Sequence, residues 1–180
     1  MNKNVCVFCA SSNEMDDLYY EAAAQLGKWL AHNGMTLVYG GSSRGLMEAT
    51  AKACHENGGR VTGVVPQILV DIDSISTYID ELIVTPDMHG RKRELIERAD
   101  VIVAMPGSVG TLDEIFTVLS SNTIGIHDKS VIIWNVNHFW DSLFAMISDI
   151  DGKGVSRKPM DEIIHRADTF DELTSMILKG

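Results

Sequence analysis

The chain has 180 residues, of which 45% are hydrophobic and 22% charged, and this length and composition favour one ordinary globular domain over a disordered, collagen-like or disulfide-rich chain. The formal net charge of −10 disfavours nucleic acid and anionic membranes as partners. No apolar run approaches the ~20 residues of a membrane span and no signal-peptide pattern begins the chain, so the sequence predicts a cytoplasmic protein.

Strand and helix patterns alternate along the whole chain. In chain order they predict the strand Val5–Cys9, helix Asp17–Asn33, strand Thr36–Tyr39, helix Leu46–Asn57, strand Val61–Val65, a loop with a short helical turn at Gln67–Tyr78, strand Glu81–Thr85, helix Met88–Ala99, strand Val101–Met105, helix Thr111–Asn122, strand Val131–Trp134, and helices Phe139–Ile147 and Phe170–Leu178. Continuous apolar strands that alternate with helices indicate an α/β fold. We therefore expect a single doubly wound, Rossmann-like domain over residues 1–180, with a parallel sheet covered by helices on both faces.

The three cysteines, Cys6, Cys9 and Cys54, are an odd number, which argues against a disulfide framework. Cys6 and Cys9 lie three residues apart on a predicted strand, so their side chains should face opposite sides of the sheet. We interpret them as buried apolar residues rather than a redox or metal-binding pair. The six histidines show no metal-ligand spacing, and we expect no metal site.

Two glycine-rich turns follow predicted strands directly, Gly40-Gly-Ser-Ser-Arg-Gly45 and Pro106-Gly-Ser-Val-Gly-Thr111. Ligands of doubly wound folds bind at the carboxyl ends of strands, where a helix N-terminus offers free N–H groups to an anion. The turns therefore favour phosphate binding, and an ordinary tight turn is the alternative. Neither turn is a Walker A sequence, and no Gly-x-Gly-x-x-Gly follows the first strand. P-loop NTP hydrolysis is thereby excluded and an NAD-dependent dehydrogenase disfavoured.

The charged residues near these turns each allow more than one interpretation. Thr111 and Glu114 have the spacing of a helix capping box, which spacing alone favours, but Glu114 could instead face the mouth of the loop and support glycosidic chemistry. Arg91, Lys92 and Arg93 open a helix, where cations oppose the macrodipole. A bound phosphate, a neighbouring carboxylate or a solvated basic face would account for them.

In combination, the motifs resemble the LOG ("Lonely guy") family of cytokinin-activating nucleoside 5′-monophosphate phosphoribohydrolases. The resemblance runs from about residue 5 to 150 and is carried by Tyr39–Met47, Asp87–Lys92, Pro106–Glu114 and Gly125–Lys129. It implies cleavage of the N-glycosidic bond of AMP or an N6-modified AMP to free base and ribose 5-phosphate, without a cofactor, by a homodimer with its sites near the interface. The family's older description, possible lysine decarboxylase, would need a lysine that binds pyridoxal phosphate, and the sequence shows no such site.

The resemblance also implies roles for individual residues. Glu114 would stabilise the oxocarbenium-like transition state and position water, and Arg91 would orient Glu114 or assist the departing base. Substrate binding is expected from Ser11, Gly41, Ser42, Gly45, Asp73, Met88, Lys92, Gly107, Ser108, Val109, Gly110 and Thr111, with Gly107–Thr111 around the 5′-phosphate.

Four positions depart from the family pattern. Ser42 and Ser108 replace glycines, and Ser121 and Thr123 stand where relatives often carry tryptophan and glutamine. Changed loop shape and base preference are the expected consequences. A non-catalytic nucleotide- or cofactor-binding protein, similar to the molybdenum-cofactor carriers, is the alternative function. The presence of both Glu114 and Arg91 favours the enzyme, and the serine substitutions favour the carrier.

Overall fold

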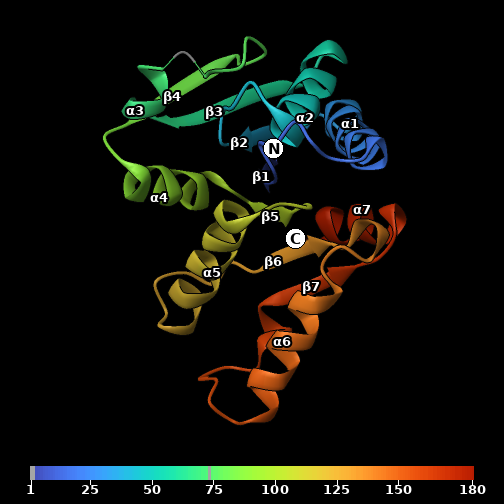
Figure 1. Ribbon diagram of the computed structural model, residues 1–180, viewed down its shortest axis with the longest axis vertical. Coiled ribbons are helices and arrows are strands. Elements are labelled where there is room, and N and C mark those ends of the chain that lie inside the picture. Colours follow the sequence, from blue (N-terminus) through green and yellow to red (C-terminus); the bar gives the residue numbers. More distant parts are fainter. Residues whose placement is uncertain (1–2, 73) are drawn as a thin grey trace.

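Seven parallel strands form one sheet in the computed structural model, which describes residues 3–72 and 74–180 (Figure 1). The strands are β1 (Asn4–Phe8), β2 (Thr36–Tyr39), β3 (Arg60–Pro66), β4 (Glu81–Thr85), β5 (Val101–Ala104), β6 (Val131–Trp134) and β7 (Ile164–Ala167). Their order across the sheet is β4-β3-β2-β1-β5-β6-β7, and each neighbouring pair is parallel. The direction of winding reverses between β1 and β5, which is the point where doubly wound sheets bind their ligands.

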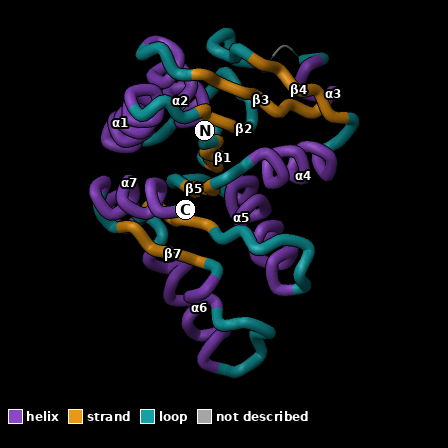
Figure 2. The backbone as a smooth tube through the Cα atoms, turned by 180° about the vertical axis from the view of Figure 1, so that it is seen from behind, coloured by secondary structure: helices purple, strands orange, loops and turns teal. Residues whose placement is uncertain are grey.

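Helices cover both faces of this sheet. They are α1 (Asp17–His32), α2 (Gly45–Glu56), α3 (Gln67–Val70), α4 (Met88–Arg98), α5 (Val109–Thr123), α6 (Asp141–Gly152) and α7 (Phe170–Lys179). One face packs against α1, α2 and α7, and the other against α4, α5 and α6 (Figures 1 and 2). The predicted α/β class and two-sided covering are thereby confirmed. Within the described ranges, no helix has the length and apolar character required to cross a membrane.

The core follows the alternation of side chains along each strand. In β1, Val5 and Val7 pack on the face of α1 and α2, while Cys6 and Phe8 pack on the opposite face. Cys9 belongs to the first cluster, and all three cysteines are buried and free. The prediction that Cys6 and Cys9 face opposite sides is therefore correct.

The structure adds one strand to the prediction and corrects the start of two helices. Strand β7 was not predicted, because only one of its two edges is paired and its centre is His165 and Arg166 rather than an apolar run. Helix α6 begins at Asp141 instead of Phe139. It is preceded by a 3₁₀ turn with a positive φ at Asn137, and Trp140 N donates a hydrogen bond to Asn135 Oδ1 across this turn. Helix α5 begins two residues before the predicted Thr111, and this shift matters for the site.

Candidate active site

A cavity of about 340 Å³ opens at the carboxyl ends of β1 and β2, between the first turns of α4 and α5. Of the residues predicted for the site, Ser11, Ser42, Met88, Arg91, Ser108, Gly110, Thr111 and Glu114 line it. Their convergence from four separate segments agrees with the rule that ligands bind at this edge of a doubly wound sheet.

The centre of the site is a buried ion pair between α4 and α5. Arg91 Nη1 donates to Glu114 Oε1 over 2.7 Å, and each side chain is only 6% exposed. Arg91 Nε also donates to the carbonyl of Val64 at 3.2 Å, which fixes the plane of the guanidinium. Burial raises the pKa of the Glu114 carboxyl, and the positive charge of Arg91 opposes that rise. The cavity thus contains a carboxylate that is desolvated and held in one orientation by a fixed cation.

Glu114 does not belong to a capping box. The N-cap of α5 is Ser108, and Thr111 lies in the first turn of the helix, so the capping interpretation of Thr111 and Glu114 is wrong. A capping box with both hydrogen bonds present occurs at α7, between Thr169 and Glu172. Because α5 begins earlier than predicted, Glu114 lies in its second turn, where it can reach Arg91.

Neighbouring carboxylates account for two of the three cations at the start of α4. Arg91 pairs with Glu114, and Lys92 Nζ lies 2.9 Å from both oxygens of Asp113. Arg93 is exposed. Helix α4 is capped by Asp87, whose carboxylate accepts from the Gly90 N–H at 2.8 Å and whose pKa is lowered by that bond. This acidic cap offsets part of the cost of cations in the first turn.

The N-terminus of α5 is open to an anion. The N–H groups of Val109, Gly110 and Thr111 donate to no acceptor within residues 3–72 and 74–180, whereas Leu112 N already donates to Ser108 O. Gly107 is required just before this turn, because a Cβ there would collide with the side chain of Thr111. Free N–H groups at a helix N-terminus form an anion-binding geometry.

The N-terminus of α2 is closed by contrast. Gly45 N donates to Asn13 Oδ1 at 2.9 Å, and Leu46 N and Met47 N both donate to the Ala10 carbonyl, at 2.9 and 3.3 Å. Of the two glycine turns predicted to bind phosphate, the first therefore has its helix N–H groups occupied, and the second remains the candidate. The first glycine turn instead docks α2 on the segment after β1, and its Gly45 has a φ of +60° where a Cβ would collide with the backbone of residues 10–12.

Gly40 has a further purpose in this turn. A Cβ at Gly40 would overlap the guanidinium of Arg91, so the absence of a side chain makes room for the ion pair. Cys9 also lines the cavity, but burial raises the pKa of its thiol, which opposes formation of a thiolate nucleophile there.

Some predicted residues do not reach the cavity, and some that reach it were not predicted. Gly41, Gly45, Lys92, Gly107 and Val109 are not among its lining residues, and Asp73 lies outside the described residues. The residues missed in the sequence include Arg44, Met47, Leu69, Ile72 and Asp113. Arg44 carried a usable signal, because it is a charged residue inside a glycine turn at the carboxyl edge. Leu69 and Ile72 come from the segment with little pattern.

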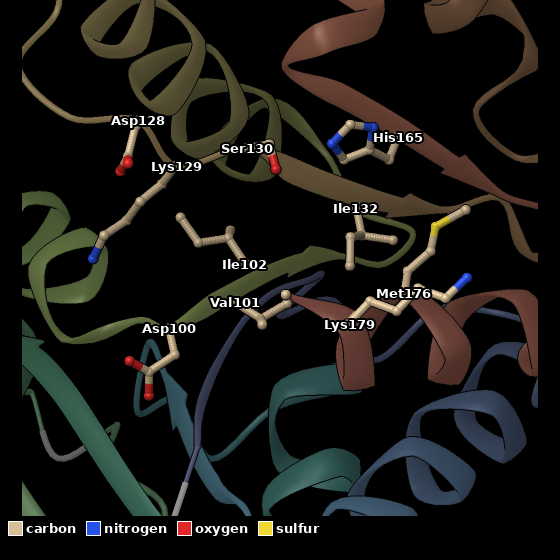
Figure 3. A pocket seen from close by; sticks show the side chains of 11 residues that line it. Asp100, Val101, Ile102, Asp128, Lys129, Ser130, Ile132, His165, Met176 and Lys179 are labelled. Carbon is tan, nitrogen blue, oxygen red and sulfur yellow. The ribbon is translucent and has the colours of Figure 1, made fainter. Parts of the chain in front are cut away.

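Size alone does not identify the site. A larger hollow of about 490 Å³ lies at the opposite edge of the sheet, near the amino ends of β5, β6 and β7, and contains none of the predicted residues (Figure 3). Its floor is apolar, with Val101, Ile102 and Ile132, and charged side chains stand at its rim (Figure 3). Across the part of the chain that the structure describes, no group of three or more His, Cys, Asp or Glu side chains is arranged to hold a metal ion.

Sequence comparison finds relatives over nearly the whole chain. Residues 47–177 match the family model described as possible lysine decarboxylase. A protein of Arabidopsis thaliana named cytokinin riboside 5′-monophosphate phosphoribohydrolase LOG3 is 36% identical over 175 residues, which cover 97% of this chain and 81% of that protein. A rice protein (Oryza sativa subsp. japonica) named probable cytokinin riboside 5′-monophosphate phosphoribohydrolase LOGL5 is 39% identical over 95% of this chain and 70% of its own.

Solved structures share the fold at lower identity. A molybdenum cofactor binding protein from Rippkaea orientalis superimposes with a TM-score of 0.76 at 22% identity, covering 99% of this chain and 97% of that one. The Moco carrier protein of Chlamydomonas reinhardtii gives a TM-score of 0.75 at 23% identity, with coverage of 99% and 97%. These similarities establish the shared fold and carry no argument about the ligand.

Proposed function

Because this chain belongs to the LOG family, we propose that it hydrolyses the N-glycosidic bond of a nucleoside 5′-monophosphate, either AMP or an N6-modified AMP, to free base and ribose 5-phosphate. The observation that carries the proposal is the buried pair of Arg91 and Glu114 in a cavity that also receives the open N-terminus of α5. One element supplies a carboxylate for the sugar, and the other supplies N–H groups for the phosphate.

The chemistry requires such an arrangement. When the bond between C1′ and the base nitrogen breaks, its electron pair leaves with the base, and the sugar gains oxocarbenium character. The ionised Glu114 stabilises that positive charge and accepts a proton from the water whose oxygen bonds to C1′. The departing base takes up this proton from Glu114, directly or through solvent, which returns the carboxylate to its ionised form, so atoms and charge balance. Arg91 keeps the carboxylate ionised and oriented, and it need not touch the substrate to do so.

The phosphate anchors the substrate away from the reacting bond. The N–H groups at the start of α5 and the hydroxyls of Ser108 and Thr111 are available to phosphate oxygens at one side of the cavity. Binding energy from this remote group positions the ribose, which increases the rate of the chemical step as well as the affinity.

We further propose that the protein forms a homodimer. Helix α5 and the loop after it expose Phe116, Ile124 and Ile126, the last of them to 69%. A second copy that covers these side chains would remove apolar surface from water. Light scattering after size exclusion should give twice the mass of the chain, and Ile126→Glu should shift it to a monomer. A wild-type monomer at micromolar concentration would contradict the dimer.

The direct test of the function is incubation of the purified protein with AMP, N6-isopentenyl-AMP and adenosine, with chromatography of the released base. We expect kcat/KM for the nucleotides to exceed that for adenosine by at least ~10²-fold, because the nucleoside lacks the anchoring phosphate. Equal turnover of nucleotide and nucleoside would contradict the phosphate anchor. Nucleotide binding without any release of base would favour a non-catalytic carrier on the same fold.

A further inference from the structure

Arg44 is a charged residue of the cavity that none of the roles above uses. It occupies the N-cap position of α2 with extended backbone, and its side chain makes no cap hydrogen bond. The residue is exposed and lines the cavity. A cation beside a helix N-terminus opposes the helix dipole, so local helix stability does not explain an arginine here.

The charges of the cavity wall balance except at Arg44. Arg91 is neutralised by Glu114, and Asp113 is neutralised by Lys92, which approaches it from α4. Arg44 forms no ion pair or side-chain hydrogen bond with any of the other residues that the structure describes. When Lys92 is counted as the partner of Asp113 from outside the lining, the described charged side chains at the cavity sum to one net positive charge, and Arg44 is the member of this set without a counterion, which suits an anionic ligand.

Ala10 links Arg44 to the open N-terminus of α5. The Ala10 carbonyl accepts from Leu46 N at 2.9 Å, two residues after Arg44, and Ala10 N donates to Pro106 O at 3.0 Å, two residues before Ser108. The start of α2 and the start of α5 thus flank one residue of the segment after β1. Neighbouring strands lie about 4.8 Å apart, so the ends of β2 and β5 are separated by about 10 Å across β1. An arginine side chain that extends from one end covers most of that gap.

On the basis of the proposed function, we propose that Arg44 is the second half of the phosphate site and sets the preference for a phosphate monoester. Its guanidinium would hold two phosphate oxygens from the side of α2 while the N–H groups of α5 hold the phosphate from the other side. A planar guanidinium matches two oxygens of a phosphate dianion, and such charge-assisted bonds are stronger than neutral ones. The ligand class is a terminal monoester such as AMP or ribose 5-phosphate, and Arg44 acts in binding rather than in bond cleavage.

The test compares Arg44→Gln and Arg44→Lys with the matched control Lys52→Gln. Lys52 lies on the outer surface of the same helix, with its side chain 52% exposed, so its replacement causes the same loss of charge away from the cavity. Arg44→Gln should raise KM for AMP and the dissociation constant of ribose 5-phosphate by about 10–100-fold, the value of a hydrogen bond to a charged group. We expect turnover of adenosine and the melting temperature to change little, whereas kcat for AMP should fall in part because the phosphate also positions the ribose. Arg44→Lys should recover part of the affinity, because it keeps the charge but not the bidentate geometry.

The outcomes separate this inference from the function on which it rests. Unchanged affinity for AMP and ribose 5-phosphate in Arg44→Gln, with hydrolysis retained, overturns the role of Arg44 alone. An equal loss with adenosine also overturns it, since the side chain would then serve the base or the fold, and so does an equal loss in Lys52→Gln. Absence of AMP hydrolysis in the wild type, together with Arg44-dependent binding of ribose 5-phosphate, overturns the hydrolase and leaves the phosphate site.

Discussion

Arg91 and Glu114 are 23 residues apart in the chain, yet Arg91 Nη1 lies 2.7 Å from Glu114 Oε1, with both side chains almost completely buried. Buried ion pairs contribute little net stability compared with apolar side chains of similar volume. The raised pKa of Glu114 agrees with this, because it means that the ionised carboxyl is less favourable in the folded protein than in water. A pair that is retained at such a cost in the wall of a cavity is explained by chemistry rather than by stability.

Replacement of Glu114 by glutamine tests this explanation directly. Glu114→Gln keeps the shape of the side chain and an acceptor for Arg91 but removes the negative charge, so kcat should fall by roughly 10²–10⁴-fold. The dissociation constant of AMP should stay within a few-fold of wild type, because the phosphate site is untouched. The melting temperature at pH 7 should be kept or raised. Steady-state kinetics, calorimetric titration and thermal unfolding provide the three measurements.

Glu172→Gln is the matched control for this change. Glu172 is the acidic member of the capping box of α7, and glutamine serves the same position in capping boxes. Its activity and melting temperature should both remain close to wild type. Full activity in Glu114→Gln would remove the carboxylate from the mechanism and return Glu114 to a purely structural role.

The acidic limb of the pH–rate profile should report Glu114. Desolvation raises the pKa of its carboxyl above the ordinary 4.5, and catalysis needs the ionised form, so kcat/KM should fall as the pH drops through that raised value. In Arg91→Gln the neutralising cation is lost. The limb should then move to higher pH, and the remaining activity at neutral pH should be low.

The same shift has an opposite effect on stability. A carboxyl with a raised folded-state pKa contributes stability below its unfolded value that is lost as the pH rises through the folded value. Chemical unfolding should therefore show wild type losing stability relative to Glu114→Gln as the pH increases through that range. An acidic limb that stays in place in Arg91→Gln would show that Glu114 is not the titrating group.

The fold was largely predictable because its signals are local. All four residues of the apolar runs Val101–Ala104 and Val131–Trp134 are buried, and this apolar character is visible in four consecutive residues of the sequence. Strand β7 was not predicted because its partner β6 lies more than 30 residues away in the chain. As an edge strand it contains the polar residues His165 and Arg166, which interrupt the apolar run by which the other strands were predicted. The motif for the site was also local, since Glu114 and Arg91 both stand in recognisable segments.

What the sequence did not reveal is which groups of the loops are already occupied. The two glycine turns look alike, but the first N–H groups of α2 are taken by Ala10 and Asn13, and only α5 stays open. A helix that begins two residues earlier than predicted also brings different side chains into contact, as α5 does for Glu114. Which N–H groups are occupied and which side chains meet depends on the distance between loops in the folded protein. Spacing along the chain does not specify that distance.

Lys92 should act through Asp113 rather than through the substrate itself. Asp113 lines the cavity near the start of α5, and Lys92 Nζ lies 2.9 Å from each of its oxygens. Lys92→Gln would leave a free negative charge near the phosphate site, so KM for AMP should increase about 10-fold while adenosine turnover changes little. The double variant Lys92→Gln/Asp113→Asn should return KM close to wild type. A double variant as weak as the single one would show instead that Lys92 binds the substrate directly.

Gly40 provides a structural test of the ion pair, because the atoms nearest to a Cβ at this position belong to the Arg91 guanidinium. Gly40→Ala adds one methyl group, which would overlap the Arg91 guanidinium. Arg91 must then move, and kcat should fall by at least ~10-fold through the displaced Glu114. Gly152→Ala is the control, since a Cβ at Gly152 in α6 meets nothing within 4 Å and its activity should equal that of wild type.

The pH profile of Gly40→Ala separates displacement of Arg91 from general unfolding. A displaced Arg91 moves the acidic limb of Gly40→Ala to higher pH, as in Arg91→Gln, whereas loss of folded protein lowers the rate equally at every pH. A fully active Gly40→Ala protein with an unshifted profile would mean that the cavity does not depend on the position of Arg91.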